Sequence, residues 1–399
     1  MVSGPDVVRP ARGTRPANRR DLIVSAAADL FYRKGYQNIG MGEVAEAVAI
    51  GPSALYRHFR GKQSLLATVI SGALRNLDDA IAAMGEPSRD IAAVLASSTL
   101  AHREVGVLWR REARHLSDED RAEFRVEARR IGARLTEVIA HRRPELDTAQ
   151  ADLLAWCALA VADSVSFHSL SLPEPEFSAL LTELIATVIG AAVPTLRQAG
   201  APRAESAPLA ASSRREAILT QAVQLFAERG FAGVGMDDIG AATGIAGPSV
   251  YNHFPGKTDI LSAAIVRGDE WLRMGMHRAL SQASDPREGL VLMLGSYSAF
   301  AFENPYLIQT LVSEVEYLPQ AERQRARVSQ RAYIGEWVHL LRGLHPDTDP
   351  LTARIRVQAA QIMVNDIAST PHLRGIPDID TTVSAIGAGL LDPAHGVDA

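Results

Sequence analysis

Apolar positions recur with the period of an α-helix along most of the chain. In the segment RRDLIVSAAADLFYRKG (19–35) they fall on one face, and a glycine stands where the helix should end: Leu22, Ile23, Ala26, Ala27, Leu30, Phe31 and Gly35. The same periodicity predicts longer amphipathic or apolar helices over 64–83, 91–115, 151–168 and 178–198. No run alternates convincingly with a period of two, so no sheet is expected. The pattern therefore predicts an all-α protein.

Shorter helices are expected on either side of a tight turn near residue 50. The segment GEVAEAVA (42–49) is typical of the first, and GPSALYRHF (51–59) begins the second with Pro52 in its first turn, where a missing N–H costs least. Far along the chain, DDIGAATG (237–244) is followed in the same way by GPSVYNHF (247–254).

These two regions belong to a long internal repeat. With a constant offset of 195 residues, 19–66 aligns with 214–261 without a gap. Identical pairs include Phe31/Phe226, Gly35/Gly230, Met41/Met236, Tyr56/Tyr251, His58/His253, Phe59/Phe254 and Lys62/Lys257. Weaker matches beyond this window pair Glu112 with Glu314 and Asp163 with Asp366. We therefore expect two whole domains, roughly 17–200 and 212–395, related by duplication.

Each copy is expected to divide into a short N-terminal domain and a longer helical body. The predicted boundaries are, in chain order, a disordered basic arm (1–16), a first helix-turn-helix domain (17–63), a first helical regulatory body (64–200), a linker (201–211), a second helix-turn-helix domain (212–258) and a second helical regulatory body (259–395). The linker region QAGAPRAESAPLAASS is rich in Ala, Pro and Ser, as flexible linkers are.

A short helix, a tight turn and a second helix that opens with small residues are typical of a helix-turn-helix DNA reader. No carboxylate stands in the opening turn of either second helix, whose residues include Gly51, Pro52, Ser53, Ala54, Gly247, Pro248 and Ser249. The next polar residues suit contacts with phosphates, which fix the register on the duplex: Tyr56, His58, Lys62, Tyr251, His253 and Lys257. Arg57 and Asn252 are the candidates for base edges, since Arg favours guanine and Asn favours adenine. Phe59 and Phe254 are expected in the core.

The pattern of a helix followed by F…GY, M…VA and I…LY.HF..K..LL resembles the N-terminal DNA-binding domain of TetR/AcrR-family transcriptional regulators. It occurs over 19–66 and again over 214–261, so the chain resembles a tandem fusion of two such regulators. The resemblance implies all-helical subunits, each with a three-helix head and a larger body that binds a small ligand and pairs through its last two helices. It also implies that ligand binding moves the heads apart and releases the operator.

The turn of the first copy departs from the family pattern. A glycine usually stands in this turn, and Gly244 keeps it in the second copy, whereas the first copy has Ala49. If the turn needs a left-handed residue, Ala49 costs about 1 kcal/mol relative to glycine. The polar residue that the family usually has before the recognition helix is replaced by Gly51 and Ala246. We therefore expect two different reading surfaces and unequal half-sites.

Composition limits the chemistry that the chain can carry. The formal net charge of −5 gives no global sign of nucleic-acid binding, but the first 35 residues hold seven Lys and Arg against three Asp. A basic arm of this kind either follows phosphates and the minor groove or is a solvated tail. The single cysteine, Cys157, excludes an intrachain disulfide and a cysteine-rich zinc site, and no metal or cofactor is expected. With no secretory signal and no apolar run long enough for a bilayer, a cytoplasmic protein is expected.

Candidate ligand-binding residues are the aromatic and acidic side chains in the apolar helices of the bodies. They are Trp109, Glu112, Trp156, Asp163 and Phe167 in the first body, and Tyr297, Glu314, Trp337, Met363 and Asp366 in the second. Aromatic residues at helical spacing are more often core than pocket, and an acid in an apolar helix needs a partner. Paired with an internal arginine these acids are structural; facing a cavity, they would select a cationic or hydroxylated small molecule.

The sequence leaves two assemblies open. The last helices of each half, 151–168 with 178–198 and 352–369 with 379–391, can pair within one chain as a pseudo-dimer, or each half can pair with its counterpart in a homodimer. The leading hypothesis is a ligand-responsive regulator that binds double-stranded operator DNA, most simply as a repressor. Metalloprotease, P-loop and nucleophile-elbow motifs are absent, so no enzyme is expected. The alternative is a helical ligand-binding or interaction protein in which one or both heads no longer bind DNA.

Overall fold

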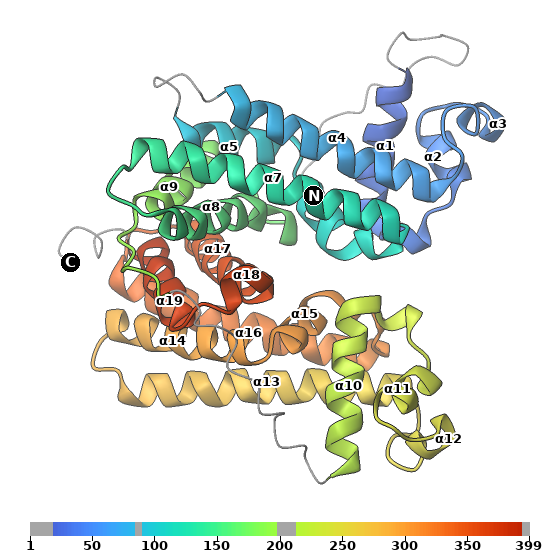
Figure 1. Cartoon of the computed structure of the whole chain (residues 1–399). Helices are drawn as coiled ribbons and strands as arrows, with labels where there is room; N and C mark the ends of the chain where they lie inside the picture. The colour runs from blue at the N-terminus through green and yellow to red at the C-terminus, as the bar shows by residue number, and fades with distance from the viewer. Residues whose placement is uncertain (1–18, 84–89, 198–212, 393–399) are drawn as a thin grey trace. The chain divides into compact units, whose positions relative to one another are not determined.

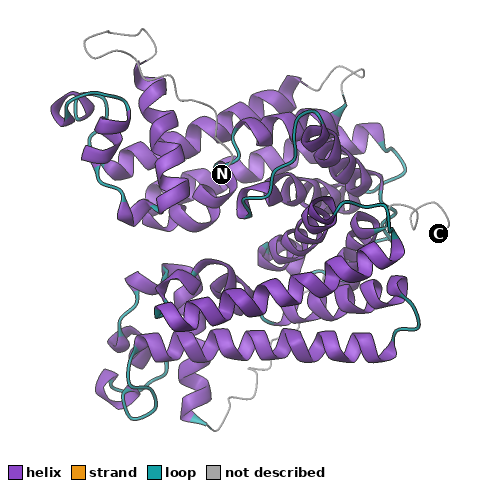
Figure 2. Ribbon diagram, turned by 180° about the vertical axis from the view of Figure 1, so that it is seen from behind, coloured by secondary structure: helices purple, strands orange, loops and turns teal. Residues whose placement is uncertain are grey.

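The computed structural model describes residues 19–83, 90–197 and 213–392. Within these ranges the chain forms helices and connecting loops and no strand, as predicted (Figure 2). Its contacts divide it into two compact units, Met1–Arg134 with Val165–Ser169, and Leu135–Ser164 with Leu170–Ala399. The predicted basic arm and the predicted linker (201–211) lie outside the described residues.

The first unit holds the first repeat as far as the middle of α7. Its α-helices, labelled in Figure 1, are α1 (Arg19–Lys34), α2 (Met41–Ala47), α3 (Pro52–Leu55), α4 (Lys62–Ala82), α5 (Ile91–Ala101), α6 (Val105–Val107) and α7 (Asp118–Arg142). Single helical turns of other types are η1 (Tyr36–Asn38), η3 (Leu108–Glu112), η4 (Ala113–His115) and η5 (Ser164–Phe167).

The single helix predicted over 91–115 is wrong, because the chain breaks after α5. It continues through α6, the π-helical turn η3 and η4 in a direction bent by 77°. Arg103 lies at the break, and its guanidinium donates hydrogen bonds of 2.5 Å to the main-chain oxygens of both Val165 and His168. These contacts join residues far apart in the chain, which helical periodicity does not register.

The second unit contains the end of the first half and the whole second half. Its helices are α8 (Thr148–Asp163), α9 (Glu176–Gly190), α10 (Arg214–Arg229), α11 (Met236–Ala242), α12 (Gly247–Val250), α13 (Lys257–Gln282), α14 (Pro286–Glu303), α15 (Pro305–Ser313), α16 (Gln320–Leu344), α17 (Pro350–Ser369), α18 (Pro371–Arg374) and α19 (Ile379–Leu391). Two 3₁₀ turns, η6 (Phe231–Gly233) and η7 (Val315–Tyr317), follow α10 and α15.

Helices of both halves meet in a four-helix bundle inside the second unit. The helices α8 and α9 pack against α17 and α19 (Figure 1). The Arg356 guanidinium donates to both carboxylate oxygens of Glu183, at 2.7 and 2.8 Å, and so joins α17 to α9. Gly389 allows a close approach of α19 to α9, because a Cβ there would lie 3.3 Å from Cγ2 of Thr187. The predicted first body (64–200) is therefore divided between the units, since the apolar faces of its last two helices are buried against the second half.

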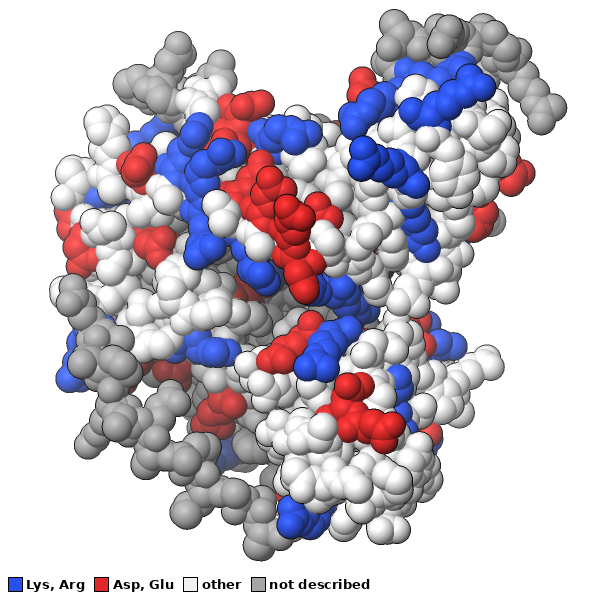
Figure 3. All heavy atoms as spheres, turned by 45° about the vertical axis from the view of Figure 1, so that its right-hand side comes forward, with Lys and Arg blue, Asp and Glu red and all other residues white. Residues whose placement is uncertain are grey.

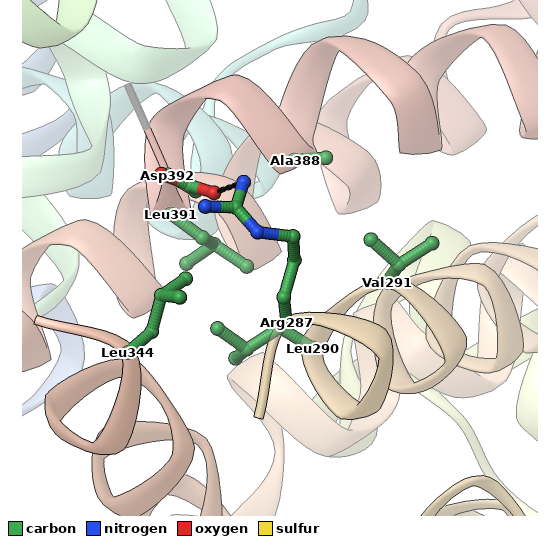
Figure 4. A pocket seen from close by; sticks show the side chains of 7 residues that line it. All are labelled: Arg287, Leu290, Val291, Leu344, Ala388, Leu391 and Asp392. Atoms are coloured by element: carbon green, nitrogen blue, oxygen red, sulfur yellow. Dashed lines mark hydrogen bonds and ion pairs between the residues drawn. The ribbon is translucent and has the colours of Figure 1, made fainter. Parts of the chain in front are cut away.

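The C-terminal end of α19 is held by polar contacts. The buried Asp392 carboxylate pairs with Arg287 at the start of α14 (Figure 4). Nε2 of His345 lies 3.1 Å from the other oxygen of this carboxylate. Leu290 and Leu391 line a small space beside the Arg287–Asp392 pair. Its volume is about 10 Å³, which is room for no more than one water molecule. This space is therefore too small for an effector.

None of the described helices is by itself long and apolar enough to cross a membrane. The bent pair Ile91–Ala101 and Val105–His115 passes that test jointly, by length and composition only.

Candidate nucleic-acid interface

Each copy of the repeat carries a three-helix head, α1 to α3 in the first and α10 to α12 in the second. The aromatic and aliphatic side chains at equivalent positions are at most 2% exposed: Phe31, Leu55 and Phe59 in the first head, and Phe226, Val250 and Phe254 in the second. The prediction that Phe59 and Phe254 are core is confirmed. The guanidinium carbon of Arg20 lies 5.2 Å from the centre of the Phe59 ring, and that of Arg215 lies 4.3 Å from the centre of the Phe254 ring.

The turns between the second and third helices have the same geometry in both heads. The N–H of Ile50 donates to the Ala45 oxygen and the N–H of Ile245 donates to the Gly240 oxygen, both at 2.9 Å. This closure places a left-handed residue in each turn, Ala49 with φ 55° and Gly244 with φ 70°. Ala49 therefore adopts the conformation in which its Cβ is strained, by about 1 kcal/mol relative to glycine.

The segment after each turn exposes its polar side chains and buries its phenylalanine ring. Tyr56 is 56% exposed and Tyr251 is 54% exposed, although both are large aromatic residues. The other exposed members of the predicted DNA-contact set are Gly51, Pro52, Ser53, Arg57, His58, Pro248, Asn252 and His253. Its half-buried members are Ala54, Lys62, Gly247, Ser249 and Lys257. The exposed side chains form a continuous polar segment in each head, and their contact with DNA stays a prediction.

The two predicted lysines differ from the other members of that set, because their ammonium groups already have protein partners. The Lys257 Nζ donates to the main-chain oxygens of Phe231 and Val234, both at 2.7 Å. The Lys62 Nζ donates to the Gln37 oxygen at 3.4 Å and lies 4.2 Å from the centre of the Tyr36 ring. Burial lowers the pKa of both ammonium groups, against the opposing effect of nearby carboxylates. Each lysine therefore has a structural role within its own half.

The second head has an acidic neighbour that sequence reasoning did not find. A Cβ on Gly247 would overlap the Asp237 carboxylate of α11, so this acid lies directly beside the start of α12. The aligned residue in the first head is Gly42, which has no such side chain. The sequence signal was the DD pair at 237–238, but only the packing of α11 on α12 brings Asp237 beside the exposed polar segment of this head.

Charge also distinguishes the two heads. The segment 19–62 has seven Lys and Arg against four Asp and Glu, whereas the aligned segment 214–257 has four against four. Lys and Arg side chains gather over the first head in Figure 3. With histidines neutral, the first head carries the positive charge that attracts a phosphate backbone, and the second head is balanced.

The predicted ligand-binding residues fall into several places. Glu112 and Glu314 lie against the heads, where the Oε2 atom of Glu314 accepts a hydrogen bond from the N–H of Phe231. Trp156 lies at the four-helix bundle, with its ring 5.5 Å from that of His372. Asp366 also lies there. The pKa of the Cys157 thiol is raised mainly by the burial of the thiol and secondly by the charge of Asp366.

The remaining candidates pack within the bodies. Trp109 makes an edge contact with Phe124 of α7, and the guanidinium of Arg110 lies over Phe167. Asp163 is half-buried at the end of α8. In the second body Met363 and Trp337 are fully buried, and the buried Tyr297 hydroxyl donates to Oδ1 of Asn365 at 2.9 Å. The structure does not bring these ten residues together in one cavity. Their role in binding a ligand therefore stays a prediction.

A groove of about 810 Å³ runs along the second body between α13 and α16. Its lining combines exposed apolar side chains, Val266 and Val328, with charges of both signs. Tyr333 also lines it, and the Tyr333 ring lies 6.1 Å from that of Trp337. Sequence reasoning missed this groove, because its residues fit the ordinary polar and apolar faces of two amphipathic helices. In the described part of the chain, no cluster of three or more His, Cys, Asp or Glu side chains is arranged to hold a metal ion.

Comparison with a protein-family model finds matches over both heads. The family model described as bacterial regulatory proteins, tetR family, matches the chain twice, over residues 23–69 and 218–264. Both matches begin inside the first helix of a head and end inside the first long helix of its body.

Curated relatives match parts of the chain. The HTH-type transcriptional activator FasR of Mycolicibacterium smegmatis is 29% identical over 110 residues, which cover 25% of this chain and 50% of that protein. The HTH-type transcriptional repressor KstR2 of the same organism is 26% identical over 155 residues, covering 37% of this chain and 75% of that protein. The chain thus spans between half and three quarters of the length of these relatives.

Solved structures also resemble single halves. The TetR family transcriptional regulator PfmR from Thermus thermophilus is 22% identical, with a TM-score of 0.36, and the match covers 41% of this chain and 95% of PfmR. The two family matches coincide with the two heads, each complete with its turn and its exposed polar segment. The segment described by the model of tetR-family bacterial regulatory proteins is therefore present twice in this chain, once in each head.

Proposed function

We propose that the protein is a sequence-specific DNA-binding transcriptional regulator with two non-identical helix-turn-helix heads in one chain. The observation that carries this proposal is the pair of exposed polar segments that follow equivalent left-handed turns, each with its Tyr and His outside and its Phe inside. A short helix that presents hydroxyl and ring N–H donors beside small residues suits entry into the major groove.

Specificity is assigned to the residues at which the two segments differ. Arg57 is suited to the O6 and N7 acceptors of guanine, and its counterpart Asn252 is suited to adenine. Just before Gly61 the first head also has Arg60, whereas the second head has Pro255 at the aligned position, before Gly256. The operator is therefore expected to have two dissimilar half-sites, one richer in guanine contacts and one closer to adenine.

One chain is proposed to supply both heads of the functional unit. The bundle of α8, α9, α17 and α19 joins the two halves through buried apolar faces and the Arg356–Glu183 ion pair. In a homodimer of a single-headed regulator, two copies of the last two helices would form such a bundle. An intrachain pseudo-dimer on a double-stranded operator is therefore favoured over a homodimer of chains.

A small-molecule effector is proposed to release the protein from its operator, which makes the regulator a repressor. The groove between α13 and α16 supports this proposal, since its volume of about 810 Å³ lies within the range of small-molecule sites. An effector with an apolar body and a polar or charged end would match its mixed lining. A chain that meets DNA in this way acts in the cytoplasm, and no catalytic step is needed.

Selection of genomic DNA tests the proposal. Sheared DNA is bound to the purified full chain at low salt, about 50 mM, where electrostatic attraction to DNA is strong, and the retained fragments are sequenced. A single enriched site with two dissimilar half-sites is expected. A symmetric site would mean that two chains use one kind of head, and a lack of enrichment by folded protein would favour a ligand-binding or interaction protein with inactive heads.

A further inference from the structure

A cluster at the base of the second head joins it to its body. The Lys257 ammonium lies 4.3 Å from the centre of the Phe231 ring, and that ring lies 5.1 Å from the ring of Tyr317 in η7. The buried carboxylate of Glu314 accepts a 3.0 Å hydrogen bond from the Phe231 N–H, while Lys257 holds the Phe231 oxygen. Both main-chain polar groups of one head residue are therefore fixed by charged side chains.

The first half has the same cluster with different details. The Lys62 ammonium lies over Tyr36, whose ring stacks on His115 in η4 with centres 5.0 Å apart. Glu112 occupies the place of Glu314, with Oε1 4.0 Å from where a Cβ on Gly35 would stand. In both halves the aromatic residue follows a glycine with positive φ, 81° at Gly35 and 74° at Gly230. The duplicated chain thus provides two independent examples of one arrangement.

We propose that each cluster is the joint that sets the orientation of its head on its body, with Glu314, Lys257 and their counterparts Glu112 and Lys62 as positioning residues. The joint spans three parts of the fold: the turn after the first helix of the head, the first residue of the long helix α4 or α13, and the turn at the end of η3 or α15. In the second half, a shift of the body turn acts on the head directly through Glu314, which accepts the hydrogen bond from the Phe231 N–H. The inference rests on the proposed function, because head orientation matters through the DNA that it reads.

This assignment gives the lysines a role different from phosphate contact. Two of the three N–H donors of Lys257 are directed at main-chain oxygens at 2.7 Å, and its side chain is half-buried over an aromatic ring. A lysine held for phosphate would keep its ammonium free in solvent. Glu314 is likewise poorly suited to contact an effector, since it is fully buried and already accepts from the Phe231 N–H and the Ser313 hydroxyl.

The two joints are unequal in strength. The second has the direct Glu314 contact and two short lysine bonds, and Nε2 of Gln309 adds a 3.0 Å bond to the Ala227 oxygen of α10. In the first, Lys62 makes one longer bond, and Glu112 is held by its own neighbours, with Nε of Arg111 at 2.7 Å and Nε2 of His115 at 3.5 Å. The second head is therefore held more firmly in its orientation.

The test uses the full chain with Lys257→Met, which keeps the apolar stem on Phe231 and removes the ammonium, and Glu314→Ala, which removes the acceptor. Amide hydrogen exchange is measured at residues 231–234, and DNA binding is measured on the selected operator. The operator is also prepared with its half-sites moved by about one base pair either way, a change that a rigid two-headed reader does not tolerate. Thr220→Ala, at an exposed position of α10 outside both the joint and the predicted DNA-contact set, is the matched control.

Both joint variants are expected to speed exchange at residues 231–234 and to bind the natural operator about tenfold more weakly. They should also lose the preference for natural spacing, while the slope of log affinity against log salt is unchanged. A head that is merely destabilised would lose affinity equally on all spacings. Glu314→Gln keeps an acceptor and should restore most of the spacing preference.

Three outcomes overturn the joint. In the first, Lys257→Met lowers the salt slope by about 0.9 without faster exchange, which identifies a phosphate contact. In the second, exchange rises but spacing preference stays, which identifies an ordinary structural contact. If the wild-type chain enriches no DNA, the proposed function fails, and unaltered exchange in Glu314→Ala would separately refute the joint.

Discussion

The two heads of this chain share their buried phenylalanine rings, whereas their exposed segments keep the same Tyr and His but differ at other positions. Inside, Phe31 and Phe59 correspond to Phe226 and Phe254 as fully or almost fully buried rings. Outside, Arg57 corresponds to Asn252. Burial constrains shape, and a changed core volume costs stability in either head, whereas an exposed side chain is free to change its chemistry. The comparison indicates one packing scheme carrying two different exposed polar surfaces.

The heads also differ in the contact between their short helices. A Cβ on Gly240 of α11 would lie 2.8 and 2.9 Å from the N and Cα of Gly247 and 2.9 Å from the Ile245 oxygen. The first head has Ala45 at the aligned position, and its side chain is buried there. The second head therefore packs its two short helices closer than the first, and this closeness brings Asp237 beside the start of α12.

The largest expected effect comes from Gly240→Ala, which gives the second head the residue of the first. The added methyl meets backbone atoms that cannot rotate away, so the second head should lose about 1–3 kcal/mol of stability. Amide exchange in 236–254 should rise, while exchange in 41–59 stays constant. Gly42→Ala is the control, because a Cβ at Gly42 meets nothing within 4 Å. Equal behaviour of the two variants would mean that the heads are packed alike.

The sequence predicted the helical fold, the duplication and the head residues, because these leave local or repeated patterns. Helical periodicity and the aligned Tyr, His and Phe residues were enough to separate the exposed Tyr56 from the buried Phe59. Even Glu112 and Glu314, matched only weakly in sequence, occupy equivalent places. The left-handed residue in the turn was also foreseen, through the glycine that Ala49 replaces.

The features that the sequence could not predict depend on contacts between distant residues. The break after α5 involves Arg103 reaching the carbonyl oxygens of Val165 and His168, and the groove depends on side chains that α13 and α16 bring together. Trp156 fitted a ligand pocket by composition, but lies at the bundle between the halves. In each case the residue type indicated that the side chain needs a contact, but the sequence did not indicate which distant residue supplies it.

The reading surfaces are compared directly by Arg57→Ala and Asn252→Ala. Each variant should lose about 1–3 kcal/mol of discrimination, but at different half-sites of the operator, because each removes the donors of one base-reading side chain. Footprinting of the selected fragment measures this by the half-site that loses protection. His141→Ala, a change on a body helix, should leave both half-sites protected. Loss of protection at the same half-site in both variants would contradict two distinct readers.

The strained turn of the first head is relieved by Ala49→Gly. Removing the Cβ at φ 55° should stabilise the first head by about 1 kcal/mol, even though glycine also loses some backbone entropy on folding. The reciprocal change, Gly244→Ala, should destabilise the second head by a similar amount, since its φ is 70° and the space around it is open. Slower exchange in 41–59 and faster exchange in 236–254 are the respective readouts. A destabilised Ala49→Gly protein would show that the turn carries no strain.

The smallest expected effect concerns pH at the first joint. Burial raises the pKa of Glu112, but the hydrogen bonds and charges of His115 and Arg111 outweigh it, so the pKa of this carboxyl lies below its ordinary value. A carboxylate of this kind stabilises the folded state at pH values above about 4.3, and its contribution is lost as the pH falls through the lower folded-state pKa.

Glu112→Gln should therefore weaken the first joint near neutral pH and make it less sensitive to acid. Pulse-labelled amide exchange of α1 and η1, after incubation at about pH 6 and about pH 3.5, compares the variant with the wild type on both sides of that range. Glu123→Gln, at an exposed position of α7, is the control. If the wild type and Glu112→Gln lose protection in parallel on acidification, the charge of Glu112 does not hold the first head, and the two joints differ only in their hydrogen bonds.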